Sequence, residues 1–332
     1  MTLASIIVPA FNVQATMRQT LEALLAQTYA HFEIIIVDDG STDATPQIAA
    51  EFATDPRVRV IRQNNRGLAG ARNSGIAAAK GAFIGFCDAD DIWLPHKLSR
   101  HAAHLQANPK VGISYAGSAF IDNEGILTGQ AQRPRLKGIG ASHIFKRNPI
   151  GNGSAPVIRR AVFDEIAYQP HFEMQRSWYF DETFRQSEDI ECWLRIALTT
   201  NWGFEGLPGL LTQYRINTTG LSAATDRQLA AWDRMVAKLT PLNPSFFAVN
   251  TKPARAYQLR YLSRRAVSAL DAPRARNLSL AWMAQSRTPL IEEPVKSIVS
   301  LAASAALSTF GGDMMRRIVK SAQALAPKAT AQ

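Results

Sequence analysis

The sequence predicts an α/β protein in which a mostly parallel sheet is flanked by helices and followed by a mainly helical C-terminal extension. Over residues 4–106, short apolar runs rich in β-branched residues alternate with segments of helical periodicity, a pattern typical of a parallel sheet. After residue 222 the pattern is helical almost throughout. Three prolines interrupt it: Pro241, Pro273 and Pro294. We therefore expect one domain over residues 1–222 and a helical extension over residues 223–332.

The first strand is expected at residues 5–8, where Ser-Ile-Ile-Val precedes Pro9. Apolar residues at helical spacing predict a helix after it. They are Val13, Met17, Leu21, Leu24 and Leu25. Residues 32–37 form an unbroken apolar run, which is typical of a strand buried on both faces of a parallel sheet.

The next elements follow the same alternation. Residues 38–43 predict a turn that leads into a helix with Thr42 or Asp43 as its N-cap. The further expected elements are a strand at 58–61, a helix at 74–80 closed by Gly81, a strand at 82–87, a helix opened by Pro95 that runs through 97–106, a strand at 115–121, a turn at 122–125, a loop-rich segment at 133–152, a helix at 188–198 and a strand leading to a loop at 206–215.

Acidic residues gather where the predicted strands end. In an open parallel sheet, ligands bind beyond the carboxyl ends of the strands, which here carry the loops 9–12, 38–41 and 88–91. Asp88 and Asp90 point the same way in an extended segment. Paired carboxylates on a loop suit Mn²⁺ or Mg²⁺. The alternative is a polar turn in which an aspartate caps the next helix.

Charge and composition narrow the classes of protein. The net charge of +10 lies entirely in residues 223–332, with 16 basic and 6 acidic residues, whereas residues 1–222 hold 21 of each. Such asymmetry indicates an anionic partner or a solvated basic face. Cys87 and Cys192 are the only cysteines, as expected in a reducing compartment. No N-terminal signal pattern is found, and we expect no apolar stretch long enough to span a membrane.

Two common nucleotide-binding motifs are absent. No G-x-G-x-x-G follows the first strand and no Walker A sequence occurs, which counts against nicotinamide and P-loop enzymes. Nucleic-acid binding would account for the basic tail but not for the acidic loops.

Four segments, in order, resemble the family 2 glycosyltransferases. They read SIIVPAFN, LLAQTYAHFEIIIVDDGSTDAT, NRGLAGARNSGIAAAKGAFIGFCDADDIW and SEDIECWLRIA, and they cover most of positions 4–222. The resemblance implies an inverting, nucleotide-sugar-dependent enzyme with the GT-A fold, whose sheet is Rossmann-like. It also implies that the donor part is about residues 1–110 and the acceptor part about residues 111–222.

The resemblance assigns the donor site residue by residue. Pro9 and Phe11 would flank the base, and Asp39 would hydrogen-bond it, most often as uracil. Arg72 would lie near the nucleotide, where Gly67 and Gly70 let the backbone come close, although a helix-surface charge is the alternative for Arg72.

The acidic loop would complete this donor site. Within the Asp88-Ala89-Asp90 motif, Asp88 would hold the ribose or the sugar and would share with Asp90 a Mn²⁺ or Mg²⁺ ion that bridges the diphosphate. Asp91 would either lie toward the sugar or support the loop.

The later motif implies the acceptor chemistry. Asp189 would be the general base that takes the proton of the acceptor hydroxyl. Glu188 is a second catalytic candidate, or simply a charge at a helix N-terminus. Arg215 would face the phosphates, and Asn217 stands where many relatives carry histidine. Residues 152–154 are expected near the acceptor.

The end of the chain predicts a basic amphipathic helix. Its apolar face would be Met314, Met315, Ile318, Val319, Ala322 and Leu325, and its basic face Arg316, Arg317 and Lys320. Such a helix could lie on an anionic membrane or pack on the core. We expect a cytoplasmic protein, peripheral at the inner face of the cell membrane if the first reading holds. Its acceptor would be a glycan, a lipid-linked molecule or another hydroxyl compound of surface polysaccharide synthesis.

The residues leave two other functions open. One is a non-catalytic nucleotide-binding scaffold of a membrane-associated glycan-assembly complex, which would not need a base opposite a metal. The other is a nucleotidyltransferase, whose glycine-rich first loop is missing because Pro9-Ala-Phe-Asn12 occupies its place.

Overall fold

The computed structural model describes residues 2–216 and 225–325. The chain divides into two compact units, and each is described by itself. The first holds Met1–Ala141 and Pro149–Leu221, and the second holds Ser142–Asn148 and Ser222–Gln332.

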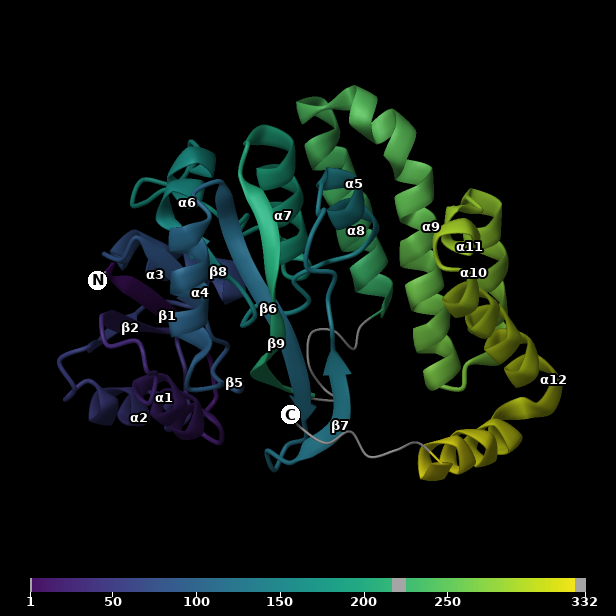
Figure 1. The fold of residues 1–332 in the computed structure, drawn as a ribbon, viewed down its shortest axis with the longest axis horizontal. Helices are drawn as coiled ribbons and strands as arrows, with labels where there is room; N and C mark the ends of the chain where they lie inside the picture. The colour runs from purple at the N-terminus through teal and green to yellow at the C-terminus, as the bar shows by residue number, and fades with distance from the viewer. Residues whose placement is uncertain (1, 217–224, 326–332) are drawn as a thin grey trace. The chain divides into compact units, whose positions relative to one another are not determined.

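A nine-stranded sheet organises the described part of the first unit (Figure 1). In order across the sheet its strands are β3 (Val58–Arg62), β2 (Phe32–Asp38), β1 (Ala4–Ala10), β4 (Phe83–Phe86), β8 (Val157–Arg159), β6 (Val111–Ile121), β9 (Gly203–Arg215) and β5 (Ile92–Trp93), with β7 (Leu127–Gln132) paired to β6. Within the group β1 to β4, all neighbouring strands run parallel to each other. Beyond β4 the sheet is mixed, because β8 runs antiparallel to both β4 and β6, whereas β6 and β9 are parallel. The predicted α/β class is confirmed, and its parallel character is strongest in the first four strands.

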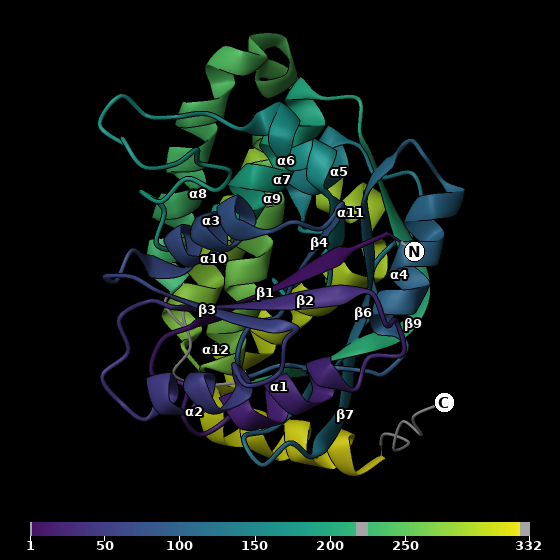
Figure 2. The same cartoon turned by 90° about the vertical axis from the view of Figure 1, so that its left-hand side faces the viewer.

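Helices cover both faces of the parallel strands, as Figure 2 shows for α3 on one side of β1 and β2 and for α1 and α2 on the other. The helices of this unit are α1 (Met17–Leu25), α2 (Thr45–Phe52), α3 (Gly67–Ala78), α4 (Lys97–Ala107), α6 (Arg160–Ile166) and α7 (Glu188–Thr199). Every residue of β1 and of β2 is buried. Ile6 and Val8 belong to the core cluster that includes Leu21 and Leu98, whereas Ile7 meets Gly75 of α3. Burial on both faces explains why these strands are apolar without alternation.

Helix α3 begins at Gly67, seven residues before the expected start at Ser74. Gly67 has a φ of 77°, a left-handed conformation that glycine adopts without strain. The backbone N–H groups of Arg66 and Gly67 both donate to the carboxylate of Asp39. A carboxylate from another loop therefore stabilises this helix N-terminus, and local helix propensity gives no sign of it.

The second unit is helical throughout the part that the structure describes. It contains α8 (Thr225–Leu239), the 3₁₀ turn η2 (Thr240–Leu242), α9 (Pro244–Ser268), α10 (Ala272–Gln285), α11 (Thr288–Glu292) and α12 (Pro294–Leu325). Helix α10 packs on α9 and on α12.

Residues 142–148 join this helical unit, and most of the short helix α5 (Ala141–Lys146) lies within them. Phe145 stacks on Trp232 with ring centroids 5.4 Å apart. Lys146 and Arg147 pair with Glu292 and Glu293, each at 2.5 Å. The expectation of a loop over 133–152 is therefore wrong at α5. Six residues are too few to display helical periodicity, and aromatic packing supplies the stability that the short segment lacks.

Helix α12 also departs from expectation. Among the described residues, the single window Pro294–Arg316 is long and apolar enough to cross a membrane by length and composition alone, with a mean hydropathy of 1.3. The expectation that no stretch reaches this length is wrong, because alanines and serines extend a run of larger apolar residues.

The predicted amphipathic helix at the chain end is only partly testable. Met314 is exposed while Met315 packs against the cluster of Ala266, Ala275 and Leu307. The other side chains of the two predicted faces lie outside the described side chains: Arg317, Ile318, Val319, Lys320, Ala322 and Leu325.

Candidate active site

The three loops expected at one sheet edge do meet there. The backbone N–H of Asp39 donates to the carbonyl of Ala10 at 2.9 Å, which joins the loops after β2 and β1. The hydroxyl of Thr16 donates to the carbonyl of Ala89 at 2.9 Å, which joins the loop after β1 to the loop after β4. Phe11 is 49% exposed beside this edge, whereas Pro9 is buried within β1.

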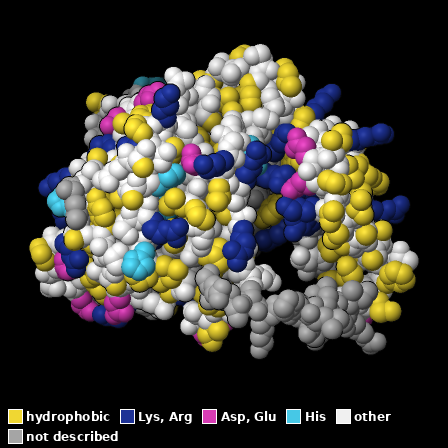
Figure 3. Space-filling view, viewed as in Figure 1, with side chains coloured by type: hydrophobic (Ala, Val, Ile, Leu, Met, Phe, Trp, Pro, Cys, Tyr) yellow, Lys and Arg dark blue, Asp and Glu magenta, His cyan; other side chains and the backbone are white. Residues whose placement is uncertain are grey.

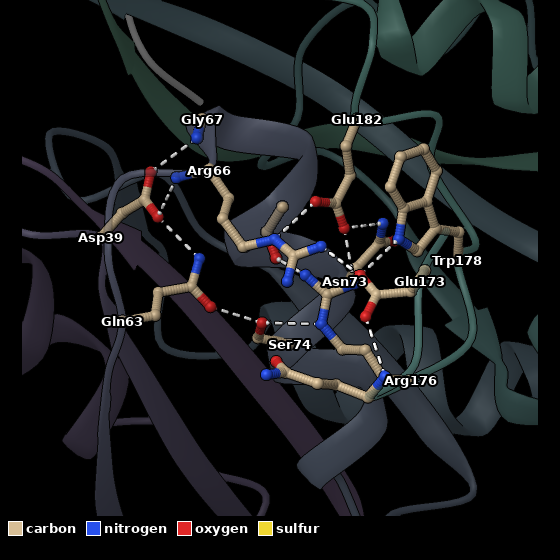
Figure 4. Close-up of polar contacts among 12 residues, drawn as sticks. Asp39, Gln63, Arg66, Gly67, Asn73, Ser74, Glu173, Arg176, Trp178 and Glu182 are labelled. Atoms are coloured by element: carbon tan, nitrogen blue, oxygen red, sulfur yellow. Dashed lines mark hydrogen bonds and ion pairs between the residues drawn. The ribbon is translucent and has the colours of Figure 1, made fainter. Parts of the chain in front are cut away.

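Asp39 anchors the loop that leads into α3 (Figure 4). Its carboxylate accepts hydrogen bonds from Gln63 Nε2 at 2.6 Å, from Arg66 N at 2.9 Å and from Gly67 N at 2.8 Å. A carboxylate has about four lone-pair positions, so three acceptor contacts leave room for one further donor. An N–H group of a base is a suitable fourth donor.

A second network ties the segment after α6 to this loop and to α3 (Figure 4). Arg66 donates through its side chain to Glu173 and to Glu182, the latter at 2.8 Å. Arg176 donates to Glu182 at 2.5 Å and to the hydroxyl of Ser74 at 3.1 Å. Because Arg66 also reaches Asp39 through its backbone, one residue connects the predicted base contact with residues 173–182.

Arg72 is the buried cation of the site. Its Nη1 donates to Glu188 Oε1 at 2.8 Å and its Nη2 to Asp88 Oδ1 at 3.1 Å. The guanidinium lies over the rings of Phe86 and Phe180, 5.7 and 5.6 Å from their centroids. Arg72 is therefore no helix-surface charge. It holds together two carboxylates, one from the loop after β4 and one from α7.

Glu188 is buried, and its carboxylate faces Arg72. Burial raises the pKa of Glu188, although the guanidinium of Arg72 opposes the shift. A carboxylate held in this way positions Arg72 more readily than it takes a proton from an acceptor, which differs from the catalytic role that the sequence offered for Glu188.

Asp91 is fully buried and hydrogen-bonded within the protein. Its Oδ1 accepts from the backbone N–H of Arg215 at 3.0 Å, and its Oδ2 accepts from the hydroxyl of Ser154 at 2.5 Å. The same hydroxyl accepts from the backbone N–H of Asp88 at 2.9 Å. Burial, and then the neighbouring aspartates, raises the pKa of Asp91 well above its usual range. Of the two roles left open for Asp91, this geometry favours support of the loop over contact with the sugar.

Arg215 also serves the loop. Its guanidinium donates to the carbonyls of Asp90, Asp122 and Asn123 and to Gln19, so that four of its five N–H groups are used. The side chain is buried, which differs from the predicted contact with the phosphates. Ala89 lies in the core cluster at 3% exposure, so its side chain faces away from the donor side.

Asp88 and Asp90 provide the oxygen atoms that a metal ion would need. The side chain of Asp88 is 25% exposed. The carboxylate of Asp90 takes no side-chain hydrogen bond within the part of the chain that the structure describes. Burial and the charge of Asp88 raise the pKa of Asp90 to about 6.

No group of three or more His, Cys, Asp or Glu residues among the described residues could hold a metal by itself. Two carboxylates with unfavourable mutual charge nevertheless fit Mn²⁺ or Mg²⁺, which completes its shell with phosphate oxygens and water.

Asp189 reaches the same edge from α7. It follows Glu188 at the helix N-terminus, where the backbone favours negative charge. The pKa of the partly buried Tyr214 is raised by burial and by the charges of four aspartates, which are Asp91, Asp88, Asp90 and Asp189. One phenol thus lies within electrostatic reach of both the acidic loop and Asp189. Asn217 lies outside the described residues.

Sequence reasoning missed three contributors to the site. Arg66 was overlooked, although it stands beside the glycines of the third motif. Ser154 was expected near the acceptor, but it bridges Asp88 and Asp91. Arg185 is exposed, and its guanidinium lies against Gly67. A Cβ added to Gly67 would come within 2.2 Å of Arg185 Nη1. The sequence offered one signal for Arg185: it is a basic residue just before the motif that contains Asp189.

Comparison with known proteins agrees with this architecture. Residues 5–167 match the sequence model of glycosyl transferase family 2. The chain is 29% identical over 233 residues to the UDP-Glc:alpha-D-GlcNAc-diphosphoundecaprenol beta-1,3-glucosyltransferase WfgD of Escherichia coli, covering 70% of this chain and 84% of that protein. It is 40% identical over 142 residues to WfaP of Escherichia coli, a protein with the same activity in its name, covering 42% of this chain and 55% of that one.

Solved structures share the fold. S. aureus TarS 1-349 in complex with UDP-GlcNAc aligns with a TM-score of 0.58 and 17% identity, covering 92% of this chain and 91% of that one. The mannosyltransferase PcManGT from Pyrobaculum calidifontis, in complex with GDP-Man and Mn²⁺, aligns with a TM-score of 0.55 and 20% identity, covering 92% and 86%.

The fold and the acidic sheet edge define a GT-A glycosyltransferase. Residues 5–167 carry a glycosyl transferase family 2 domain, and with relatives that are named glycosyltransferases the protein is a transferase enzyme. The resemblance recognised in the four motifs, the fold class and the enzyme class are thereby confirmed.

Proposed function

We propose that this protein is an inverting glycosyltransferase that moves a sugar from a UDP-sugar to a hydroxyl group of a lipid-linked glycan acceptor. One observation carries the proposal. Asp88 and Asp90, on the loop after β4, and Asp189, in the first turn of α7, all lie within electrostatic reach of Tyr214, and Asp88 shares the buried Arg72 with Glu188 of α7. The names of the Escherichia coli relatives, and the UDP-GlcNAc bound to TarS, support the donor and acceptor classes.

The donor would bind along the edge from β1 to α7. Phe11, held by the buried Pro9 at the end of β1, offers a face for the base, and Asp39 has one acceptor position left for its N–H. Gly67 lets the backbone come close, and Arg185 lies beside it to face the diphosphate. Arg72 acts from behind by holding Asp88 in place.

Asp88 and Asp90 would hold a Mn²⁺ or Mg²⁺ ion against the diphosphate. A bound cation of this kind supplies stabilisation of the charge that develops on the departing nucleoside diphosphate. The chain itself keeps the two carboxylates in place, because Asp91, Ser154 and Arg215 tie their loop to the protein.

Asp189 would take the proton of the acceptor hydroxyl as its oxygen attacks the anomeric carbon on the face opposite to the leaving group. That geometry inverts the configuration at this carbon. General-base catalysis contributes about 10²–10⁴-fold to a rate, so the loss of Asp189 should cost a comparable factor.

We propose that residues 1–222 form the transferase domain, with its donor part at about 1–110 and its acceptor part at about 111–222. Residues 223–332 would hold the enzyme at the anionic cytoplasmic face of a membrane, where lipid-linked acceptors are presented.

The decisive experiment combines a donor screen with three variants of the full chain. Nucleotide-sugars are tested for Mn²⁺-dependent protection against thermal unfolding, and the sugar of the best donor is then followed into lipid-linked acceptors. Asp189→Asn should keep donor binding and lose transfer, whereas Asp90→Asn should lose the Mn²⁺-dependent part of the protection. Asp164→Asn, on the exposed side of α6, is the matched control and should behave as wild type.

Two outcomes would overturn the proposal. Full turnover by Asp189→Asn would remove the assigned base. Donor binding without transfer to any hydroxyl acceptor would favour the scaffold function instead.

A further inference from the structure

Helix α12 buries three serines among the residues that face its unit and leaves several large apolar side chains exposed. Three serines face inward and are almost fully buried, namely Ser297, Ser300 and Ser304. The large side chains that face outward are Val295 at 73% exposure, Ile298 at 58%, Val299 at 60% and Phe310 at 62%. A surface helix of a water-soluble protein turns its large apolar side chains inward, as α12 does with Leu307, and does not leave a row of them exposed.

Two of the buried serines, Ser297 and Ser300, form hydrogen bonds within the protein. The hydroxyl of Ser297 donates to the carbonyl of Pro289 at 2.6 Å and accepts from Arg260 Nη1 at 2.6 Å. The hydroxyl of Ser300 donates to the carbonyl of Lys296, one turn earlier, at 2.7 Å. Small hydroxylated residues at this spacing let helices approach closely and are typical of helix packing in lipid. The inward face is therefore a finished interface of the helical unit.

The outward face has no covering element among the described residues of its unit. Ile291 in α11, the helix just before α12, is also exposed, at 78%. Figure 3 shows hydrophobic side chains across the surface of α10 to α12, with Lys and Arg side chains projecting beside them. The window Pro294–Arg316 is only 22% buried.

Charge around this face favours an anionic surface. The acids of the region are engaged: Glu292 by Lys146, Glu293 by Arg147 and Arg260, and Asp313 by Arg316. Residues 223–332 hold 16 basic residues against 6 acidic ones, so unneutralised cations remain. Two copies of this face would bring like charges together, whereas anionic lipid headgroups would neutralise them.

We propose that the outward face of α12, formed by Val295, Ile298, Val299 and Phe310, lies in the interface of an anionic lipid bilayer while its serine face stays packed on the helical unit. Helix α12 then lies along the membrane rather than across it, because leaving the unit would expose the bonded serines. This inference rests on the proposed function for its purpose, since it would place the enzyme where a lipid-linked acceptor is found.

Single-cysteine labelling tests this geometry in the full chain. The native Cys87 and Cys192 are both buried, so one exposed cysteine can be labelled selectively. A polarity-sensitive fluorophore is placed at Ile298→Cys, and at Val249→Cys as a control on the exposed side of α9. Val249 is 73% exposed, as Val295 is.

Vesicles of phosphatidylcholine with phosphatidylglycerol should shift the emission of the Ile298→Cys label to the blue and leave the Val249→Cys label unchanged. Pure phosphatidylcholine should give a much weaker effect. The double variant Val295→Asp/Val299→Asp should reduce cosedimentation with the anionic vesicles at least about 10-fold, because charged side chains are costly at membrane depth, whereas Val249→Asp should not.

Three results would overturn the inference. Equal shifts at both labels would mean electrostatic adsorption without a preferred face. No shift at either label would mean no docking. A concentration-dependent shift without vesicles, together with a dimer in sedimentation, would mean that a second copy covers α12. Transfer to a soluble acceptor analogue without vesicles is measured in parallel, so that failure of the enzymatic proposal is seen separately.

Discussion

Replacing Arg72 with methionine removes the buried cation but keeps a long apolar side chain against the rings of Phe86 and Phe180. Two carboxylates, those of Asp88 and Glu188, then lose their counter-charge. Glu188 is buried and cannot recover it from solvent, whereas Asp88 is 25% exposed and can be partly hydrated. Removing one partner of a buried ion pair costs about 3–5 kcal/mol. Because Asp88 is partly screened, we expect Arg72→Met to lower the free energy of unfolding by about 3 kcal/mol at neutral pH.

The loss should depend on pH. Burial already raises the pKa of Glu188, and the loss of Arg72 removes the interaction that opposes this shift. A carboxyl group whose pKa is raised by folding costs nothing at a pH below its pKa in the unfolded chain. The cost grows as pH rises through the pKa of the folded state. The difference between wild type and Arg72→Met should therefore be smaller near pH 5 than near pH 8.

Urea unfolding followed by the fluorescence of the buried Trp93 and Trp193 measures this difference at both pH values. Arg18→Met is the matched control. Arg18 also pairs with a carboxylate, Glu51 at 2.5 Å, and lies over an aromatic ring, Phe52 at 5.6 Å, but its pair is exposed. We expect a small and pH-independent effect there. A loss below about 1 kcal/mol for Arg72→Met, or one equal at the two pH values, would refute the reasoning, because a buried pair must cost more.

Two further predictions concern the supports of the acidic loop. Ser154→Ala leaves Asp91 Oδ2 buried without its donor and should lower the free energy of unfolding in urea by about 2 kcal/mol. The control Ser99→Ala, on the exposed side of α4, should change it by no more than about 0.5 kcal/mol. Equal losses in the two variants would contradict the support of Asp91 by Ser154. Burial lowers the pKa of Lys97 to about 7, so between about pH 7 and 10 the unfolded chain binds a proton that the folded chain does not. Wild-type stability should then rise with pH by up to about 1.4 kcal/mol per unit from this group, and Lys97→Met, measured at pH 7 and 9, should lack that rise and be costlier at pH 9. An identical pH slope in both proteins would show that Lys97 is protonated throughout.

Local patterns in the sequence were sufficient for the first half of the fold. The apolar runs at 5–8 and 32–37 became β1 and β2, and the acids that follow the strands met at one edge. These features depend on neighbours within a few positions, so periodicity and turn chemistry indicate them. The family follows from four such segments in order.

The roles of individual polar residues were decided by the tertiary structure. Arg72 and Glu188 are 116 positions apart, and Asp91 and Arg215 are 124 apart. Whether a carboxylate near the site faces a ligand or an internal donor depends on which distant segment packs against it. The local sequence Asp-Ala-Asp-Asp at residues 88–91 does not distinguish the buried Asp91 from the partly exposed Asp88.

The second unit shows the same division. Composition alone indicated helices and an excess of positive charge after residue 222. It did not reveal that α5 joins them, or that α12 turns Ser297, Ser300 and Ser304 inward and Val295, Ile298 and Val299 outward. A helical pattern specifies which residues share a face, but only packing against α9 and α10 decides which face is buried, and the small serines on that face allow close approach.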